Sequence, residues 1–491
     1  MSKHLFISIL LGSLAILSIA NAQGKPNIIV IVADDLGYGD LGFTGHPTIK
    51  TPNLDKLSKG GATFTHFYSP AQVCSPSRAA AITGRMPHRL GIYSFIGGSS
   101  GSLTHLPKTE ITIPQLLRKN GYQTAMIGKW HNSLIEVQMK RDKAGKNDIP
   151  SMDHYGFDYW FCSDDNAKIR NKPNWIRNGK NEGMKKGLAA NIVGQEAVHW
   201  LTKERNPSKP FIQFVHFYEP HWYVDAPEDI TKQYLAKDTD NKNQAIYFAA
   251  VTNVDKEIGN IHRTLEELKI ADNTLILFTS DHGPSTLGDG KRDRNYGSAE
   301  PYRGYKYGLW DGSVHAPGVA HWPAKIKPNT IIDTPAGAID WLPTICEVTK
   351  TPLPANLELD GKSHLSLLMG KSMQRQKPLQ WHHYNTNFNH APNPNAVLRI
   401  GDYVICGFYA PETQLKRSSW KEKHLKLVKT GKLVRFQLFN IKTDPTQKTD
   451  LSKQEPEQFK KLKTQLINAH SEMQSQAMGW DGVQPIKQLT N

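Results

Sequence analysis

The segment Asn27-Ile28-Ile29-Val30-Ile31-Val32-Ala33 is a continuous apolar run, rich in β-branched residues. Such a run is typical of a central strand that is buried on both faces of a parallel sheet. The segment Thr274-Leu275-Ile276-Leu277-Phe278-Thr279-Ser280 has the same character. We therefore predict that both segments are buried strands. The other strands and helices are assigned around them.

The elements around these two strands alternate between strand and helix. Shorter strands are expected at 123–127 and 211–216, and a helix is expected to start at 51–57. A long helix at about 245–268 carries an apolar stripe that consists of Ile246, Ala250, Val254, Ile258, Ile261, Leu265 and Leu268. This alternation indicates an α/β fold with a layered sheet.

The pattern changes after about residue 370. Short strands are expected at 379–384, 396–400, 403–408 and 434–439, a loop at 385–395, and a closing helix at 455–476. We predict a large α/β domain at 23–370 and a small C-terminal α+β subdomain at 378–491, joined by the polar, basic stretch 370–377.

The first 22 residues read as a signal peptide. Lys3 and His4 precede an apolar stretch from Leu5 to Ile19, and Ala20-Asn21-Ala22 fits cleavage between small residues. The stretch is short for a membrane span, although a retained N-terminal anchor is the alternative. We predict an exported protein, periplasmic or secreted, without stable membrane insertion.

The charge and the cysteine count narrow the class of protein. The net charge of +15 favours polyanionic partners, and neither zinc-finger spacing nor an RNA-binding signature accompanies it. If this charge serves binding, we expect a sulfated glycan rather than nucleic acid, because the protein is predicted to be exported; a generic basic surface is the alternative. Four cysteines (Cys74, Cys162, Cys346 and Cys406) are too few for a disulfide scaffold. The sequence leaves open whether any two of the last three are bridged.

Acidic and imidazole side chains follow the two buried strands. Asp34 and Asp35 come directly after 27–33, and Asp281 and His282 come directly after 274–280. Ligand sites of open α/β sheets lie beyond the carboxyl ends of the strands, so these residues point to one shared site. Their oxygen atoms suit calcium or magnesium, whereas His282 suits softer cations.

The stretch Cys74-Ser75-Pro76-Ser77-Arg78 is the most specific motif. An unpaired cysteine is unusual in an exported protein, and a proline shortly after it suits the first turn of a helix. A small buried cysteine at a helix start is the plain interpretation. The stretch, however, closely resembles the signature of type I sulfatases, in which the cysteine is oxidised to formylglycine by a maturation enzyme.

The resemblance spans most of 27–343 and extends to the metal residues. The segment 27–40 resembles the family's opening motif, in which both aspartates bind calcium. Thr279-Ser280-Asp281-His282-Gly283 resembles its second metal motif, in which many members have asparagine where His282 stands. The resemblance therefore implies an alkaline-phosphatase-like fold with a large, mixed, mostly parallel sheet. It also implies a divalent cation at Asp34, Asp35, Cys74, Asp281 and His282, with calcium favoured and magnesium possible.

Further motifs imply a sulfate pocket. Gly128-Lys129-Trp130-His131 matches a motif that assigns Lys129 to sulfate and His131 to the formylglycine hydroxyl, although Asn132-Ser133 replaces the usual leucine and glycine. Pro220-His221-Trp222 matches the second active-site histidine. Lys306 lies in the segment of the second sulfate-binding lysine, where Asp311-Gly312-Ser313 replaces the usual Glu-Gly-Gly.

The chemistry of sulfate ester hydrolysis explains these residue types. Lysines and a divalent ion offset the negative charge of the substrate and of the transition state. The hydrated aldehyde has two hydroxyls: one attacks sulfur, and deprotonation of the other lets sulfate leave. Arg78 would orient this group, His131 would act as the base and His221 would protonate the leaving alcohol, although the two histidine roles can be exchanged.

The substrate is expected to be a sulfated galactan, fucan or glycosaminoglycan. Basic runs at 139–143, 168–172, 185–186 and 291–294, together with Trp175, Trp222 and Trp310, could line its groove. The segments 309–323 and 340–344 look most like N-acetylgalactosamine-6-sulfatases and marine polysaccharide sulfatases. The alternatives are a phosphodiesterase or phosphonate monoester hydrolase of the same superfamily, and a non-catalytic binder of sulfated glycans.

Overall fold

The computed structural model describes residues 24–96, 104–136, 138, 149–164, 168–285, 296–384, 393–410 and 422–479. The predicted signal peptide and the basic runs 139–143 and 291–294 lie outside these residues, as does most of the predicted loop 385–395. Within the described residues, no helix is both long and apolar enough to cross a membrane.

The main sheet has eleven strands and is mostly parallel around its centre. The strand order is β10-β2-β9-β8-β1-β7-β3-β4-β5-β6, and β11 pairs with β2. The bounds are β1 Asn27–Ala33, β2 Ala62–Tyr68, β3 Gln123–Gly128, β4 Tyr159–Cys162, β5 Trp175–Arg177, β6 Lys180–Gly183, β7 Phe211–His216, β8 Thr274–Ser280, β9 His315–His321, β10 Thr330–Ile332 and β11 Ala336–Gly337. The two buried strands predicted from the sequence are therefore β1 and β8, and they are parallel neighbours.

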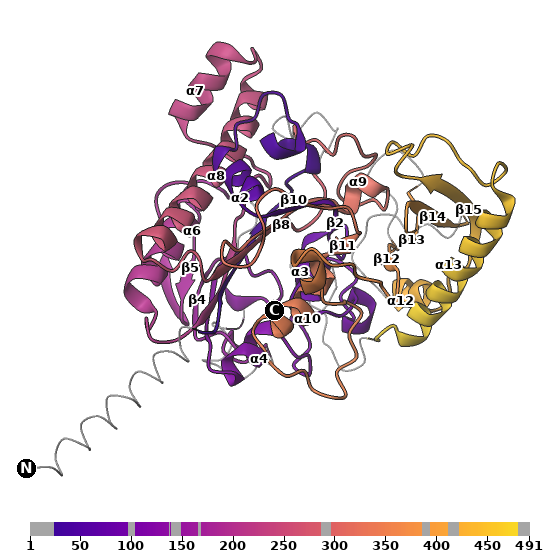
Figure 1. Cartoon of the computed structure of the whole chain (residues 1–491), viewed down its shortest axis with the longest axis horizontal. Helices are drawn as coiled ribbons and strands as arrows, with labels where there is room; N and C mark the ends of the chain where they lie inside the picture. The colour runs from indigo at the N-terminus through magenta and orange to yellow at the C-terminus, as the bar shows by residue number, and fades with distance from the viewer. Residues whose placement is uncertain are drawn as a thin grey trace, which may run out of the picture.

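Helices cover both faces of this sheet (Figure 1). On one face lie α2 (Pro52–Lys59), α6 (Ala189–His199) and α8 (Lys242–Glu267), with α7 (Glu228–Lys237) packed on α8. On the other face lie α3 (Cys74–Thr83), α4 (Ile113–Lys119) and α10 (Trp341–Val348). Strand β1 serves both layers, because Ile28 and Val30 pack toward α3 and α4 while Ile29 and Ile31 pack toward α2 and α8.

Short helical segments connect these elements. They are η1 Tyr38–Asp40, η2 Gly42–Thr44, η3 Pro87–Leu90, η4 Trp200–Glu204, η5 Ala338–Asp340, α9 Asp311–Val314 and α11 Leu365–Leu368.

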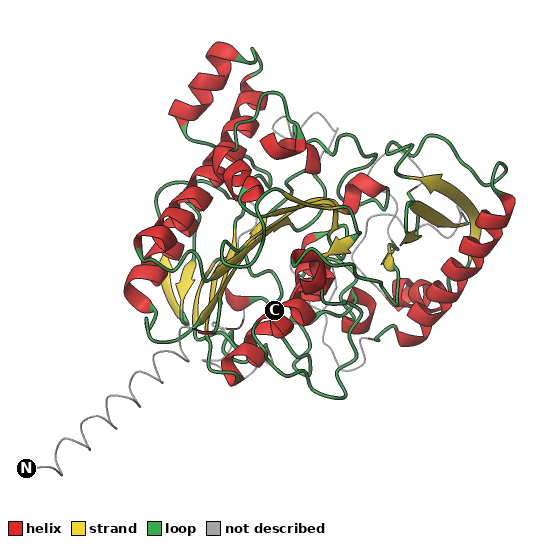
Figure 2. Ribbon diagram, viewed as in Figure 1, coloured by secondary structure: helices red, strands yellow, loops and turns green. Residues whose placement is uncertain are grey.

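A second, four-stranded antiparallel sheet follows, in the order β12-β13-β14-β15 (Figure 2). Its strands are β12 Leu379–His382, β13 Ala396–Ile400, β14 Tyr403–Tyr409 and β15 Leu433–Asn440, and its helices are α12 Glu422–Thr430 and α13 Pro456–Gln476. One face packs on α13 through Leu398 and Leu466. The other face packs Val397 against Trp310 and Trp381, in a cluster shared with the main domain. The C-terminal elements expected from the sequence are thus present.

The carboxyl ends of four central strands meet at one edge of the main sheet. In the strand register, Ala33 of β1 is opposite Ser280 of β8, and His216 of β7 is opposite both Val32 of β1 and Gly128 of β3. The residues that follow these strands therefore emerge side by side, as expected for the ligand edge of an α/β sheet. All four cysteines are buried and free, so no disulfide forms between them in the structure.

Candidate active site

Two acidic pairs meet at this edge, as their positions after β1 and β8 predict. Asp34, Asp35, Asp281 and His282 are buried, and His282 Nε2 lies 3.4 Å from Asp281 Oδ1 and 3.5 Å from Asp35 Oδ1. Burial raises the pKa of Asp281 to about 6, and the nearby Asp34 carboxylate adds to this effect. Burial alone would lower the pKa of His282, but Asp281 outweighs it, and the pKa is raised to about 9.

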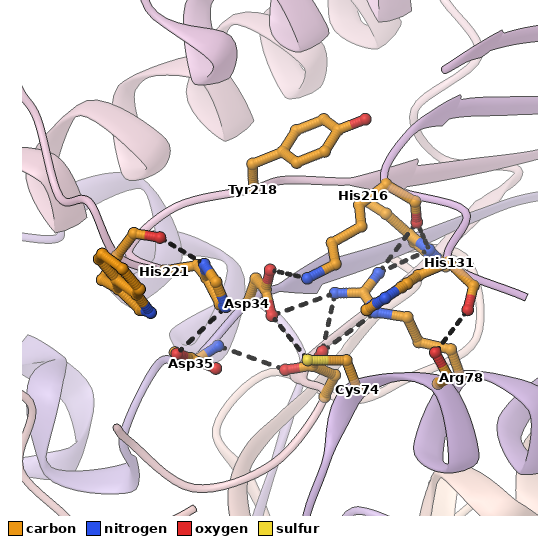
Figure 3. A network of polar contacts seen from close by, with 12 residues as sticks. Asp34, Asp35, Cys74, Arg78, His131, His216, Tyr218 and His221 are labelled. Carbon is orange, nitrogen blue, oxygen red and sulfur yellow. Dashed lines mark hydrogen bonds and ion pairs between the residues drawn. The ribbon is translucent and has the colours of Figure 1, made fainter. Parts of the chain in front are cut away.

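Cys74 lies at the centre of the group, at the first residue of α3 (Figure 3). Its Sγ is 3.3 Å from His282 Nε2 and 3.7 Å from Asp34 Oδ1. Burial alone would raise the pKa of the Cys74 thiol, but Lys129 and Lys306 outweigh it and lower the pKa to about 7. The helix start predicted from Pro76 is present, and it presents Cys74 to the ends of β1 and β8.

Two buried lysines from separate loops pair with the first two aspartates. Lys129 follows β3 and donates from Nζ to Asp34 Oδ2 at 2.5 Å. Lys306 donates from Nζ to Asp35 Oδ1 at 2.6 Å. Burial opposes the charge on both lysines, but the facing carboxylates raise both pKa values above the ordinary value. Both lysines therefore stay cationic beside Cys74.

Arg78, one turn after Cys74 on α3, pairs with the third aspartate. Its Nε donates to Asp281 Oδ2 at 3.0 Å, and its Nη1 donates to the carbonyl oxygen of Lys129 at 3.1 Å. Nη2 lies 2.9 Å from Asp281 Oδ2 and 3.7 Å from Asp34 Oδ1 and makes no hydrogen bond. This buried Nη2 belongs to the ion pair with Asp281 but has no hydrogen bond of its own.

The two predicted histidines lie on opposite sides of this group (Figure 3). His131 Nε2 donates to the carbonyl oxygen of Ile96 at 3.1 Å, and His131 Nδ1 is buried without a partner. His221 Nδ1 donates to the carbonyl oxygen of Trp222 at 2.7 Å, and its Nε2 lies 3.9 Å from Asp35 Oδ2. Burial holds the pKa of His131 well below its ordinary value and lowers that of His221 to about 3.

The structure adds two residues that the sequence interpretation missed. Ser75 Oγ donates to the carbonyl oxygen of His131 at 2.6 Å and accepts from the amide of Ile96 at 2.9 Å, so it joins α3 to the histidine loop. His216 Nδ1 lies 3.1 Å from Arg78 Nη1. His216 is the last residue of a predicted strand, so the rule that pointed to Asp34 and Asp281 could have found it.

The donor set fits a divalent cation. One atom from each of Asp34, Cys74, Asp281 and His282 lies within 4.8 Å of the others, and Asp35, Cys74 and His221 form a second such group. Asp35 Oδ2 is buried with no hydrogen-bond partner, and a buried carboxylate oxygen needs a partner. Because His282 Nδ1 faces the carbonyl oxygen of Gly283 at 2.9 Å, Nε2 is directed toward the carboxylates.

The prediction that Trp175 and Trp310 line a substrate groove is wrong. Trp175 is fully buried and stacks on Phe161 with 4.6 Å between the ring centroids. Trp310 is buried against Phe408 and Phe439 in the cluster between the two sheets. Both tryptophans are core residues, because each indole finds aromatic neighbours inside the protein.

Lys172, at the end of the predicted basic run 168–172, is also fully buried. Its Nζ lies 4.0 Å above the ring of Tyr218, which is a cation–π contact. Of the predicted groove residues among those that the structure describes, Trp222 is half-buried, and Lys168, Arg170 and Lys186 are exposed.

Comparison with known proteins agrees with this geometry. Residues 26–351 match the Sulfatase family model, and residues 305–421 match the model of the C-terminal part of N-sulphoglucosamine sulphohydrolase. Human steryl-sulfatase is 30% identical over 456 residues, which cover 77% of this chain and 76% of that protein. Human N-acetylgalactosamine-6-sulfatase is 30% identical over 383 residues, which cover 72% of this chain and 68% of that protein.

A solved structure shares the whole architecture. The crystal structure of Ps i-CgsB in complex with k-i-k-neocarrahexaose has a TM-score of 0.75 and 24% sequence identity, and the match covers 92% of this chain and 94% of that one. A likeness at this level of identity shows the fold.

Proposed function

Because this chain belongs to the sulfatase family and is a sulfuric ester hydrolase, we propose that it removes sulfate from a sulfated carbohydrate. We propose further that it works through a formylglycine made from Cys74 by a maturation enzyme, together with a divalent cation. It is exported to the periplasm or secreted after loss of residues 1–22.

One observation carries this proposal: the surroundings of Cys74 Sγ. Three carboxylates, two lysines and one arginine from several segments of the chain converge on this buried atom. Each carboxylate has a close cation: Lys129 for Asp34, Lys306 for Asp35 and Arg78 for Asp281, and Arg78 also lies 3.7 Å from Asp34. A structural cysteine at a helix start has no need of such surroundings, since an apolar site suits it better.

The two groups that complete the site can be assigned to residues. Asp34, Asp35, Asp281 and His282 would hold the cation, calcium being favoured and magnesium the alternative, and the cation supplies positive charge where negative charge develops. Formylglycine at position 74 would supply a hydrated aldehyde: one hydroxyl would attack sulfur and displace the alcohol, and deprotonation of the other would expel sulfate and restore the aldehyde.

The lysines and Arg78 bind the sulfate ester. Lys129 and Lys306 are buried and cationic, and they face the position of Cys74 from two different loops. A sulfate group that enters between them offers anionic oxygens in place of the aspartates. Arg78 Nη2 has no hydrogen bond of its own and can donate to the same group.

The hydrogen bonds of the two histidines support the base role for His131 and the acid role for His221. His131 donates a hydrogen bond from Nε2 to the carbonyl oxygen of Ile96. Its buried Nδ1 therefore has a free lone pair and can accept a proton. His221 donates a hydrogen bond from Nδ1 to the carbonyl oxygen of Trp222, so its Nε2 faces the pocket. Although burial lowers the pKa of His221 to about 3, a bound anionic ester raises it toward the protonated form that an acid needs.

Two exposed tyrosines next to the pocket support a carbohydrate substrate. Tyr223 and Tyr305 are 58% and 42% exposed, and they are the exposed large aromatic side chains among the residues that the structure describes. One lies two residues after His221, and the other directly precedes Lys306. An aromatic ring face at a pocket mouth suits the apolar face of a pyranose ring.

The first experiment is a peptide-mass measurement at position 74 in protein from the native host, with rates on an aryl sulfate and a phosphate diester. We expect a mass about 18 Da below that of cysteine, and faster turnover of the sulfate. An unmodified thiol with no turnover would indicate a non-catalytic binder. Faster turnover of the diester would indicate the phosphodiesterase alternative.

The second experiment tests the carbohydrate class with Tyr223→Ala and Tyr305→Ala. We expect each variant to raise KM for a sulfated oligosaccharide about tenfold, with little change for a small aryl sulfate, because the ring contacts the sugar and not the sulfate. Tyr223→Phe and Tyr305→Phe keep the rings and serve as matched controls. Equal effects on both substrates, or none, would contradict a sugar-binding role.

A further inference from the structure

His216 is placed to act on Arg78. It is the last residue of β7, and its side chain enters the gap between α3 and the loop that follows β3 (Figure 3). Its Nδ1 lies 3.1 Å from Arg78 Nη1 and 3.1 Å from the carbonyl oxygen of Lys129. Arg78 Nη1 lies at the same distance, 3.1 Å, from that carbonyl.

The distances admit two tautomers of His216, because a protonated Nδ1 could donate to the Lys129 carbonyl. That tautomer would place two donors 3.1 Å apart, since a guanidinium nitrogen only donates, so the geometry favours an Nδ1 that accepts from Arg78 Nη1 with its lone pair. The two protons of Nη1 then go to His216 Nδ1 and to the Lys129 carbonyl. The proton of the neutral His216 ring is consequently on Nε2. Burial, reinforced by the charge of Arg78, holds the pKa of His216 well below its ordinary value, which agrees with a neutral ring.

His216 and Asn132 line one small cavity, and each carries an unsatisfied polar atom. The space that water-sized molecules can occupy in this cavity is about 20 Å³. His216 Nε2 and Asn132 Oδ1 are both buried and without a hydrogen-bond partner. Most of the other lining is apolar and includes Val32, Ile82, Trp130, Phe214 and Trp341.

A donor and an acceptor that face one such cavity are complementary to water. About 20 Å³ is enough for one water, which needs roughly 10–15 Å³ by this measure, and such a water can accept from His216 Nε2 and donate to Asn132 Oδ1. Asn132 stands where the family's motif has leucine, so this chain has a polar group where an apolar one is usual. This pairing would keep the Nε2 proton in place and the Nδ1 lone pair directed at Arg78.

We propose that His216 is a positioning residue of the reaction: through Nδ1 it fixes the guanidinium of Arg78, while an ordered water in the cavity joins its Nε2 to Asn132. The argument rests on the proposed role of Arg78. Nε is bound to Asp281 and both protons of Nη1 are bound, so Nη2, which lies 2.9 Å from Asp281 Oδ2, is the nitrogen that lacks a hydrogen bond and that we assign to the substrate. Without the acceptor at Nδ1, the guanidinium can rotate about its stem and withdraw Nη2 from the pocket.

Two substitutions distinguish the roles of the two ring nitrogens of His216. His216→Asn keeps an oxygen near the Nδ1 position, so the acceptor for Arg78 remains. His216→Gln places its amide near the Nε2 position, so contact with the cavity remains and the acceptor for Arg78 is lost. We expect the Asn variant to stay within about threefold of the wild-type kcat and the Gln variant to lose about tenfold or more, with KM little changed in both.

A double-mutant cycle with Arg78→Lys distinguishes positioning from a general loss of structure. If His216 acts through Arg78, then His216→Gln should lower kcat much less in the Arg78→Lys background than in the wild type. Phe214→Leu alters the same cavity without a polar change, and it should lower Tm while kcat is kept. Tm and bound metal are measured for every variant.

The outcomes are distinct. Equal kcat losses for the Asn and Gln variants, or a loss for His216→Gln that persists fully in the Arg78→Lys background, would overturn the inference. A full wild-type rate for Arg78→Lys itself would instead overturn the proposed role of Arg78. A mature wild-type enzyme that releases no sulfate from any ester would overturn the proposed function.

Discussion

At the scale of single residues, Cys74 is the centre of the proposed active site. It is buried and has no disulfide partner, and its thiol contacts Asp34 and His282. The charged groups around it would be costly to bury around an inert cysteine. Their convergence therefore supports the proposed anionic substrate and the proposed modification of Cys74.

Replacement of Cys74 tests whether this residue provides the nucleophile. We expect Cys74→Ala to abolish turnover, because the nucleophile is lost, while Tm falls by only a few degrees, since one small side chain is removed. Cys346→Ala removes another buried cysteine, on α10, and is the matched control that should keep turnover. Near-normal turnover by Cys74→Ala would contradict the nucleophile assignment.

Removal of the divalent cation should separate activity from folding. Chelation is expected to lower kcat by at least a hundredfold, because positive charge is lost at the developing anion. The far-UV circular dichroism should stay unchanged, because Lys129, Lys306 and Arg78 still pair with the three aspartates. Restoration by calcium or by magnesium then identifies the ion, and global unfolding on chelation would contradict this account of the charges.

At the scale of elements, the site depends on how β3 ends. Gly128 is the last residue of β3 and has a φ of +96°, where a side chain is strained. A Cβ at this position would lie 1.9 Å from the carbonyl oxygen of His216. The turn therefore needs glycine, and it directs Lys129 and His131 into the pocket.

Two glycine substitutions separate this close approach from backbone strain alone. Gly121 has a φ of +85°, and a Cβ added there would meet no atom within 4 Å, so Gly121→Ala should cost about 1 kcal/mol of unfolding free energy. Gly128→Ala adds a collision with the backbone of β7, and we expect a loss of about 3 kcal/mol together with reduced turnover. Denaturant unfolding measures both, and equal losses would contradict the importance of the contact with His216.

The strands and helices also show what sequence patterns can predict. The runs 27–33 and 274–280 predicted β1 and β8 because a strand buried on both faces must be apolar throughout. The aspartates that follow these two strands lie close together because parallel strands end at the same edge of the sheet. By contrast, the expected roles of Trp175, Trp310 and Lys172 failed, since burial depends on which elements pack over a side chain.

At the scale of the whole molecule, buried histidines lie where the two sheets meet. His88 follows α3, and its carbonyl oxygen accepts from the amide of Met478, just beyond α13, at 3.0 Å. Its ring lies 6.0 Å from that of His382 on β12. Burial lowers the pKa of His88 to about 3 and that of His382 well below its ordinary value.

These shifts predict loss of stability in acid. A histidine with a folded pKa of about 3 binds fewer protons in the folded than in the unfolded state between pH 3 and 6.5, so stability rises with pH across this window and is lost as pH falls. His88 alone should cost about 2 kcal/mol between pH 7 and pH 5. Thermal unfolding across this range should show a flatter pH dependence for His88→Gln, and an unchanged slope would contradict the assignment.

The amino-acid sequence by itself predicted four central strands of the main sheet, the long helix α8, the C-terminal strands and the candidate site residues. Those features depend on local apolar runs, on strand ends and on motifs of a few residues, which can be read along the chain. Only the tertiary structure decided that Arg78 contacts His216, that each aspartate has a close cation, and that two of three tryptophans are core. These contacts join segments that are tens to hundreds of residues apart, and their geometry depends on the packing of whole layers, which no local pattern encodes.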